Sequence, residues 1–181
     1  MKLIYTILCC LLFSAATSSQ DRYLTKNGAI NFYSKAPMED ITADNNQVLS
    51  IIDASNGNMA IQILMKSFLF EKALMQEHFN ENYVDSDTYP KATFKGTILN
   101  FDAVGANASK QKVKGMLTMH GVTKEIIIDA NFIKKDEVIL VDGNFIIDLD
   151  DFKIEIPAVV AKNIAKKIKV SFDFNHKPYK R

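Results

Sequence analysis

The three histidines, His78, His120 and His176, are the first candidates for metal binding or proton transfer in this chain. A metal site on one element needs two of them a few residues apart, as in His-x-x-x-His, and no pair has such a spacing. His120 stands beside an expected turn and His78 on the edge of an expected helix. A structural or surface role is therefore favoured over metal or acid–base chemistry.

Two pairs of carboxylates, Asp85/Asp87 and Asp150/Asp151, are the remaining candidates for acid–base work. Neither pair has a histidine or a nucleophile pattern near it, and turn or capping roles are typical of aspartates in such positions. The chain also lacks the G-x-S-x-G, P-loop and G-x-G-x-x-G patterns. We assign no catalytic and no metal-ligating residue, and an enzyme is the least favoured function.

The N-terminus has the pattern of a secretory signal peptide. Lys2 supplies a positive start, residues 3–16 form an apolar run, and small residues follow it. At about 14 residues the run is short for a membrane span, which needs roughly 20. Residues 1–19 are thus predicted to be cleaved from an exported, periplasmic or secreted, bacterial protein. An uncleaved N-terminal anchor is the alternative.

Both cysteines, Cys9 and Cys10, fall inside the predicted signal peptide. The predicted mature domain, residues 20–181, therefore has no disulfide, no thiolate nucleophile and no cysteine metal site. A single domain of this length buries enough apolar surface to fold without such cross-links.

The charges of the mature chain balance. Lys and Arg total 22 against 21 Asp and Glu, and loss of Lys2 with the signal peptide leaves 21 of each. No basic excess indicates nucleic acid as a partner. The basic residues gather toward the C-terminus, where a solvated face is favoured and weak contact with an anionic membrane surface is the alternative. They are Lys162, Lys166, Lys167, Lys169, Lys177, Lys180 and Arg181.

Most of the mature chain alternates apolar and polar residues with a period of two, which indicates strands with one buried face. The eight predicted strands cover about residues 29–34, 47–52, 61–66, 91–99, 112–119, 125–132, 138–147 and 167–174. Tight turns are predicted at residues 55–58 and at His120-Gly121, and Asp142-Gly143 is interpreted as a bulge.

Two segments depart from the strand pattern. Residues 68–83, approximately, have helical spacing and end at an acidic turn, and a short helix is predicted near 157–165, beginning at a proline. Sheets of this size close on themselves or fold into a sandwich. Because the strands are long and single-faced, we predict a mainly β, single antiparallel eight-stranded lipocalin-like β-barrel with one helix across its mouth.

The inward faces of the predicted strands, with the predicted helix, supply the candidate ligand-binding residues, and none of them is ionisable. An eight-stranded barrel either fills with its own side chains or holds one small ligand, so a packed core stays open as an alternative. An apolar lining would favour a long hydrocarbon chain. The candidates are Phe32, Ile61, Ile63, Met65, Phe68, Phe79, Phe94, Ile98, Met119, Ile126, Ile128, Phe132, Phe145, Phe172 and Phe174.

Residues 74–128 carry two motifs that together resemble the YceI-like family. One is a helix end with phenylalanine followed by Tyr-Pro at the entry to a strand, and the other is a Gly-x-Leu-Thr-x-x-Gly-Val-Thr hairpin. The residues are Phe79, Tyr89, Pro90, Phe94, Gly115, Leu117, Thr118, Gly121, Val122 and Thr123. The resemblance implies an exported lipocalin-like barrel that encloses a polyisoprenoid or an isoprenoid quinone.

Two functions remain after these observations. The leading hypothesis is an exported lipid-binding protein that sequesters or carries an isoprenoid-type molecule inside the barrel. The alternative is a filled barrel that acts without a ligand, as a structural or interaction module in an envelope stress response. An apolar lipid is the expected partner, no other cofactor is expected, and a homodimer is left open.

Overall fold

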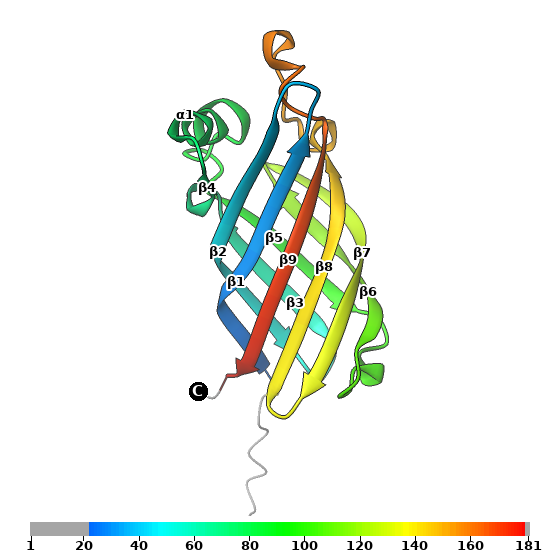
Figure 1. Ribbon diagram of the computed structural model, residues 1–181. Coiled ribbons are helices and arrows are strands. Elements are labelled where there is room, and N and C mark those ends of the chain that lie inside the picture. Colours follow the sequence, from blue (N-terminus) through cyan, green and yellow to red (C-terminus); the bar gives the residue numbers. More distant parts are fainter. Residues whose placement is uncertain (1–21, 180–181) are drawn as a thin grey trace, which may run out of the picture.

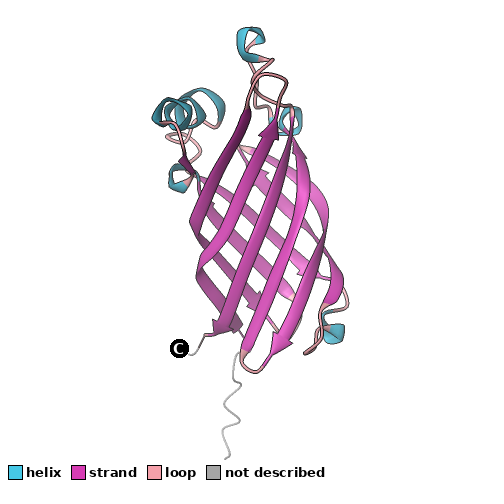
Figure 2. Ribbon diagram, viewed as in Figure 1, coloured by secondary structure: helices cyan, strands magenta, loops and turns pink. Residues whose placement is uncertain are grey.

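Eight long antiparallel strands form a closed ring in the computed structural model, which describes residues 22–179 (Figures 1 and 2). The ring runs β1-β9-β8-β7-β6-β5-β3-β2 and closes where β1 pairs with β2. The predicted eight-stranded barrel is confirmed, and the sandwich is excluded. The strands are β1 Arg22–Lys35, β2 Asp40–Asp53, β3 Asn58–Leu64, β5 Lys91–Ile98, β6 Ser109–Met119, β7 Val122–Lys135, β8 Val138–Asp148 and β9 Lys167–Pro178.

The alternation of apolar and polar residues in the sequence places apolar side chains inside the barrel and polar side chains on its outer wall. On β6, Val113 and Leu117 are buried while Lys112 and Lys114 are exposed. Gly115 lies directly opposite Gly96 of β5, where an added Cβ would meet backbone atoms at about 2.5 Å. The pair of glycines lets these two strands approach under the ring of Phe94, which covers both positions.

The predicted helix at about 68–83 exists only from its sixth residue onward. Its first residues form the short strand β4, Leu69–Phe70, which pairs with Ala43 and Asp44 of β2. Helix α1 then covers Ala73–His78 and continues as the π-helical turn η2, Phe79–Tyr83. The backbone of β4 bonds to the sheet, and this tertiary pairing overrides the helical spacing of the sequence.

The short helix predicted near 157–165 is present only as a single 3₁₀ turn, which follows Pro157. This turn, η5, covers Ala158–Val160, with Val160 N donating to the Pro157 carbonyl at 3.0 Å, and other residues of the segment bond to neighbouring parts of the chain. Ala165 N donates to Ser34 Oγ at 2.9 Å, and the Lys162 carbonyl accepts from Met38 N at 3.2 Å. The other 3₁₀ turns are η1 Met65–Ser67, η3 Phe101–Ala103 and η4 Leu149–Phe152.

The predicted bulge at Asp142-Gly143 is also absent, since β8 keeps an unbroken register with β9 there. Gly143 instead makes room for the Phe172 ring, whose Cζ lies 2.6 Å from where a Cβ would be. The register shifts that do occur lie in β1, between Thr25 and Ile30. A bulge increases local bending, and this one lies in the strand that closes the barrel.

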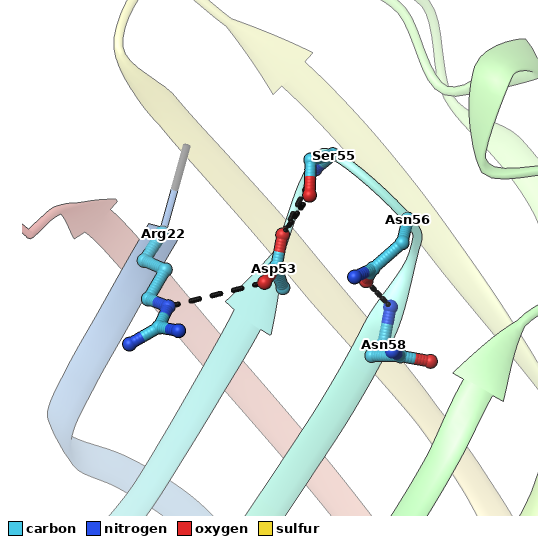
Figure 3. A network of polar contacts seen from close by, with 5 residues as sticks. All are labelled: Arg22, Asp53, Ser55, Asn56 and Asn58. Atoms are coloured by element: carbon cyan, nitrogen blue, oxygen red, sulfur yellow. Dashed lines mark hydrogen bonds and ion pairs between the residues drawn. The ribbon is translucent and has the colours of Figure 1, made fainter. Parts of the chain in front are cut away.

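Polar contacts fasten the end of the barrel at which the described chain starts and stops. Arg22 Nε lies 3.9 Å from Asp53 Oδ2, and Asp53 also accepts hydrogen bonds from Ser55 (Figure 3). In the same turn Asn58 N donates to Asn56 Oδ1 at 2.9 Å, and the turn lies where the sequence predicts it. Tyr179 N donates to the Arg22 carbonyl at 2.7 Å, which ties β9 to the start of β1.

The two ends of the barrel therefore differ, and we name them here. The closed end carries the turns β2–β3 and β7–β8 and the described chain ends, and the open end carries the β1–β2 turn, α1 and residues 149–166 (Figure 1). The predicted signal peptide, residues 1–19, lies outside the described residues. Across residues 22–179, no helix combines the length and the apolar character needed to cross a membrane.

Candidate ligand-binding cavity

A cavity of about 480 Å³ lies inside the open end of the barrel, and its walls are almost entirely apolar. Inward side chains of β1, β3, β5, β6, β8 and β9 form its sides, and α1 with η2 covers one flank. This volume falls within the usual range for small-molecule sites. Its border includes exposed side chains such as Lys72 and Leu74, so the cavity opens to solvent at this end.

The structure divides the fifteen candidate residues into two groups. Seven line the cavity: Phe32, Ile63, Met65, Phe68, Phe79, Met119 and Phe145. The other eight lie outside its lining: Ile61, Phe94, Ile98, Ile126, Ile128, Phe132, Phe172 and Phe174. The lining also includes residues that were not among the candidates, notably Ile30, Phe70, Met75, Leu117, Ile147, Ile164, Ile168 and Val170.

Four phenylalanines form an aromatic cluster on one wall of the cavity. Phe32 of β1 lies 5.4–5.6 Å, ring centre to ring centre, from each of Phe68, Phe70 and Phe79. Phe79 is also 5.1 Å from Phe70 and 5.6 Å from Phe68. These are stacked and edge-on distances at which aromatic pairs attract. The cluster fastens η2 to the barrel, and its rings pack on one another beside the cavity.

The charged groups on the cavity lining are confined to its mouth. Lys72 Nζ donates to Glu39 Oε1 at 2.5 Å, across 33 positions of sequence, and the Lys72 side chain is 61% exposed. This contact raises the pKa of Lys72 above its usual value. Burial also raises the pKa of the phenol of Tyr83, a further residue of the lining. A bound molecule would therefore meet hydrocarbon inside and an ion pair at the entrance.

A second, smaller cavity of about 300 Å³ lies at a lateral seam in the barrel wall, between β7 and β8. The paired register of these strands ends at Ala130 and Gly143, so toward the open end they are no longer hydrogen-bonded to each other. Leu117, Phe145 and Ile147 line both this cavity and the larger one. The seam is bridged by an ion pair from β7 to η4, between Lys124 Nζ and Asp151 Oδ1 at 3.1 Å.

The closed end contains the one histidine that is fully buried, His176, for which the sequence favoured a structural or surface role. His176 Nδ1 lies 3.2 Å from the Ile139 carbonyl, and Nε2 lies 2.8 Å from Ser50 Oγ. Because a carbonyl only accepts, Nδ1 carries the proton and Nε2 accepts from the Ser50 hydroxyl. Burial lowers the pKa of His176 from 6.5 to about 4, so the ring is neutral at pH 7.

Of the other polar candidates, His78 lies on the cavity lining, and His120 and Asp85 have structural contacts. His120 Nδ1 lies 3.0 Å from the Phe152 carbonyl, and the His120 ring packs edge-on against Tyr89 at 4.8 Å. This places the Tyr-Pro motif against the β6–β7 turn. Asp85 accepts from Thr88 N within its turn. Between Arg22 and Tyr179, no three His, Cys, Asp or Glu side chains gather as a metal-binding group.

A closed eight-stranded antiparallel barrel with an apolar cavity at one end defines a lipocalin-like architecture. The YceI-like domain family matches residues 25–176 of this chain. The chain belongs to the YceI-like domain family, which confirms the resemblance given by its motifs.

Relatives and solved structures agree with this assignment. A UPF0312 protein of Vibrio cholerae is 42% identical over 52 residues, which span 29% of this chain and 25% of the Vibrio protein. A polyisoprenoid-binding domain from Saccharophagus degradans, implicated in plant cell wall breakdown, superimposes with a TM-score of 0.76 at 16% identity, over 88% of this chain and 99% of that one. Burkholderia cenocepacia BcnA gives 0.69 at 18% identity, over 82% and 95%. At these identities the two solved structures establish the fold.

Proposed function

We propose that this protein is an exported carrier that holds an isoprenoid-type lipid in the cavity at the open end of its barrel. The observation that carries the proposal is the apolar cavity itself, whose lining is interrupted by charge only at the mouth. Burial of hydrocarbon there contributes about 25 cal/mol per Å² removed from water. A long apolar chain gains most from such a site, because it offers the most surface.

The position of the charged groups suggests how the lipid lies. The hydrocarbon chain would enter between Ile63, Met119 and Phe145, and a polar head would remain near Glu39 and Lys72. The polyisoprenoid named for the Saccharophagus domain, which shares the fold, supports this class of ligand for our chain. The lateral seam adjoins the cavity and offers room for the part of a chain that the cavity does not contain.

The proposal is tested by purifying the protein from its own cells, extracting it with organic solvent and identifying the extract by mass spectrometry. We expect an isoprenoid lipid in near-stoichiometric amount. The control is the same protein unfolded in detergent and refolded before extraction, which should yield none. Lipid-free protein from all growth conditions, with the cavity formed, would contradict the proposal.

Export is supported by the N-terminal sequence, and it has its own test. N-terminal analysis of the protein from fractionated cells should show that it begins between Ala16 and Gln20 and lies outside the cytoplasm. A cytoplasmic protein that still begins at Met1 would contradict export and leave lipid binding unaffected.

A further inference from the structure

The open end carries a small apolar projection at the border of the cavity. Residues 157–162 project beyond the end of the barrel, at the top of Figure 1, and contain the turn η5. Val159, in that turn, is 90% exposed, whereas its neighbour Val160 lines the cavity. Consecutive valines therefore face solvent and the binding site, which makes this projection part of the cavity rim.

Other exposed apolar side chains surround the same opening. Met38, in the β1–β2 turn, is 69% exposed and is joined to the projection by its hydrogen bond to the Lys162 carbonyl. Leu74 of α1 is 60% exposed and also lines the cavity. The rim adjoins the apolar interior at Leu74 and, through Val160, at Val159. We call Met38, Leu74 and Val159 the apolar rim.

The segment from the projection into β9 is basic. From Pro157 to Phe172 the sequence contains four lysines and no acidic residue. Lys162 stands directly beside the apolar turn and is exposed, while Lys166 also pairs with Asp150 at 2.8 Å. Lysines that flank a few protruding apolar side chains are typical of peripheral contact with a bilayer, where apolar groups enter and cations meet anionic lipid heads.

We infer that the open end docks on an anionic lipid bilayer, with Val159 and Met38 inserted into it and Lys162 at the level of the head groups. A lipid that moved between bilayer and cavity along this rim would never cross open water. Lipid transfer along the rim rests on the proposed carrier function. Docking does not, because the lipid-free protein should also bind the bilayer. A bilayer suits the surface better than a protein partner, because the apolar groups are separate protrusions around an opening.

Sedimentation with vesicles tests the inference on lipid-free protein. Vesicles of phosphatidylglycerol and phosphatidylcholine in equal amounts should carry the protein down, and raising the salt concentration should release part of it. Vesicles of phosphatidylcholine alone should carry down less. Val159→Asp should weaken binding by about tenfold, and the double change with Met38→Asp by more.

The matched control is Ile127→Asp, because Ile127 is a 57% exposed apolar residue on the barrel wall, outside the rim. It should leave vesicle binding unchanged, and thermal unfolding should show that all variants remain folded. Docking is refuted if the wild type ignores anionic vesicles, or if Ile127→Asp weakens binding as much as Val159→Asp.

The two proposals fail separately. If the protein yields lipid on extraction but does not bind anionic vesicles, docking is refuted and the carrier function is supported. If the protein binds anionic vesicles but never contains lipid, docking is supported and the carrier function is refuted.

Discussion

The two ends of this barrel are built by the same strands, but one interior is packed with buried side chains and the other encloses a cavity. At the closed end Phe132, Phe174, Ile52 and Ile139 all belong to the buried core, with at most 1% exposure. At the open end the same alternation places large side chains inward, and a cavity remains. At the open end the rings of the aromatic cluster pack against one another on one wall, and space remains beside them.

The comparison shows that an inward-facing position does not predict a binding position. Phe174 and Val170 lie on the same face of β9, yet the first fills the closed end and the second lines the cavity. Strand period fixes the face of a side chain, while its height along the barrel axis decides its role. The interior is therefore packed at the closed end, and the cavity that the lipid hypothesis requires lies at the open end.

Removing one phenyl ring at each end gives the largest predicted difference. Phe132→Ala should lower the free energy of unfolding by about 3–5 kcal/mol, because it opens a void in packed surroundings. Phe145→Ala should cost only about 1 kcal/mol, because that half-buried ring already borders empty space. Urea unfolding measures both, and equal costs would show that the two interiors are packed alike.

The pH dependence of stability should come largely from the closed end. The pKa of His176 is about 4 when folded and 6.5 when unfolded, so the unfolded chain binds a proton first as the pH falls. The contribution of His176 is complete above pH 6.5 and is lost between there and about pH 4, amounting to about 3 kcal/mol.

His176→Gln provides the control for this effect. The variant should be less stable at neutral pH, because glutamine replaces the ring imperfectly, and its unfolding free energy should fall less between pH 6.5 and 4. Denaturant titrations across this range measure the slope. An unchanged slope in the variant would assign the pH dependence to other groups.

The smallest predicted effect lies at the lateral seam. Asp151→Asn removes the ion pair with Lys124, both partners of which are about half exposed, and should cost less than about 1 kcal/mol. Hydrogen exchange should increase locally in β7 and η4, while the closed end keeps its protection. A loss of stability comparable to that of Phe132→Ala would mean that the seam holds the barrel together.

Much of the fold was predictable because strand alternation is local. The eight strands, the two turns and the family motifs follow from neighbouring residues, and His176 itself continues the alternation of Phe172 and Phe174, a signal that identifies its inward position. The first half of β1 was not predicted, because the register shifts between Thr25 and Ile30 interrupt the alternation of inward and outward residues.

The site was less predictable because its features join distant segments. Glu39 and Lys72 meet at the mouth without any sequence pattern that links them. The first residues of the predicted helix become β4 because β2 offers a partner. Which seven of the fifteen candidates line the cavity depends on their height along the barrel axis, which the strand period does not reveal.

The central claim is that the space at the open end binds the lipid, and a matched pair of tryptophans on β6 tests it most directly. Met119 points into the cavity, and Met116 of the same strand is exposed on the outer wall. Titration with a fluorescent isoprenoid should give saturable binding to the wild type and to Met116→Trp, and should show at least a tenfold loss in Met119→Trp, whose indole occupies the cavity. Undiminished binding by folded Met119→Trp would contradict the account.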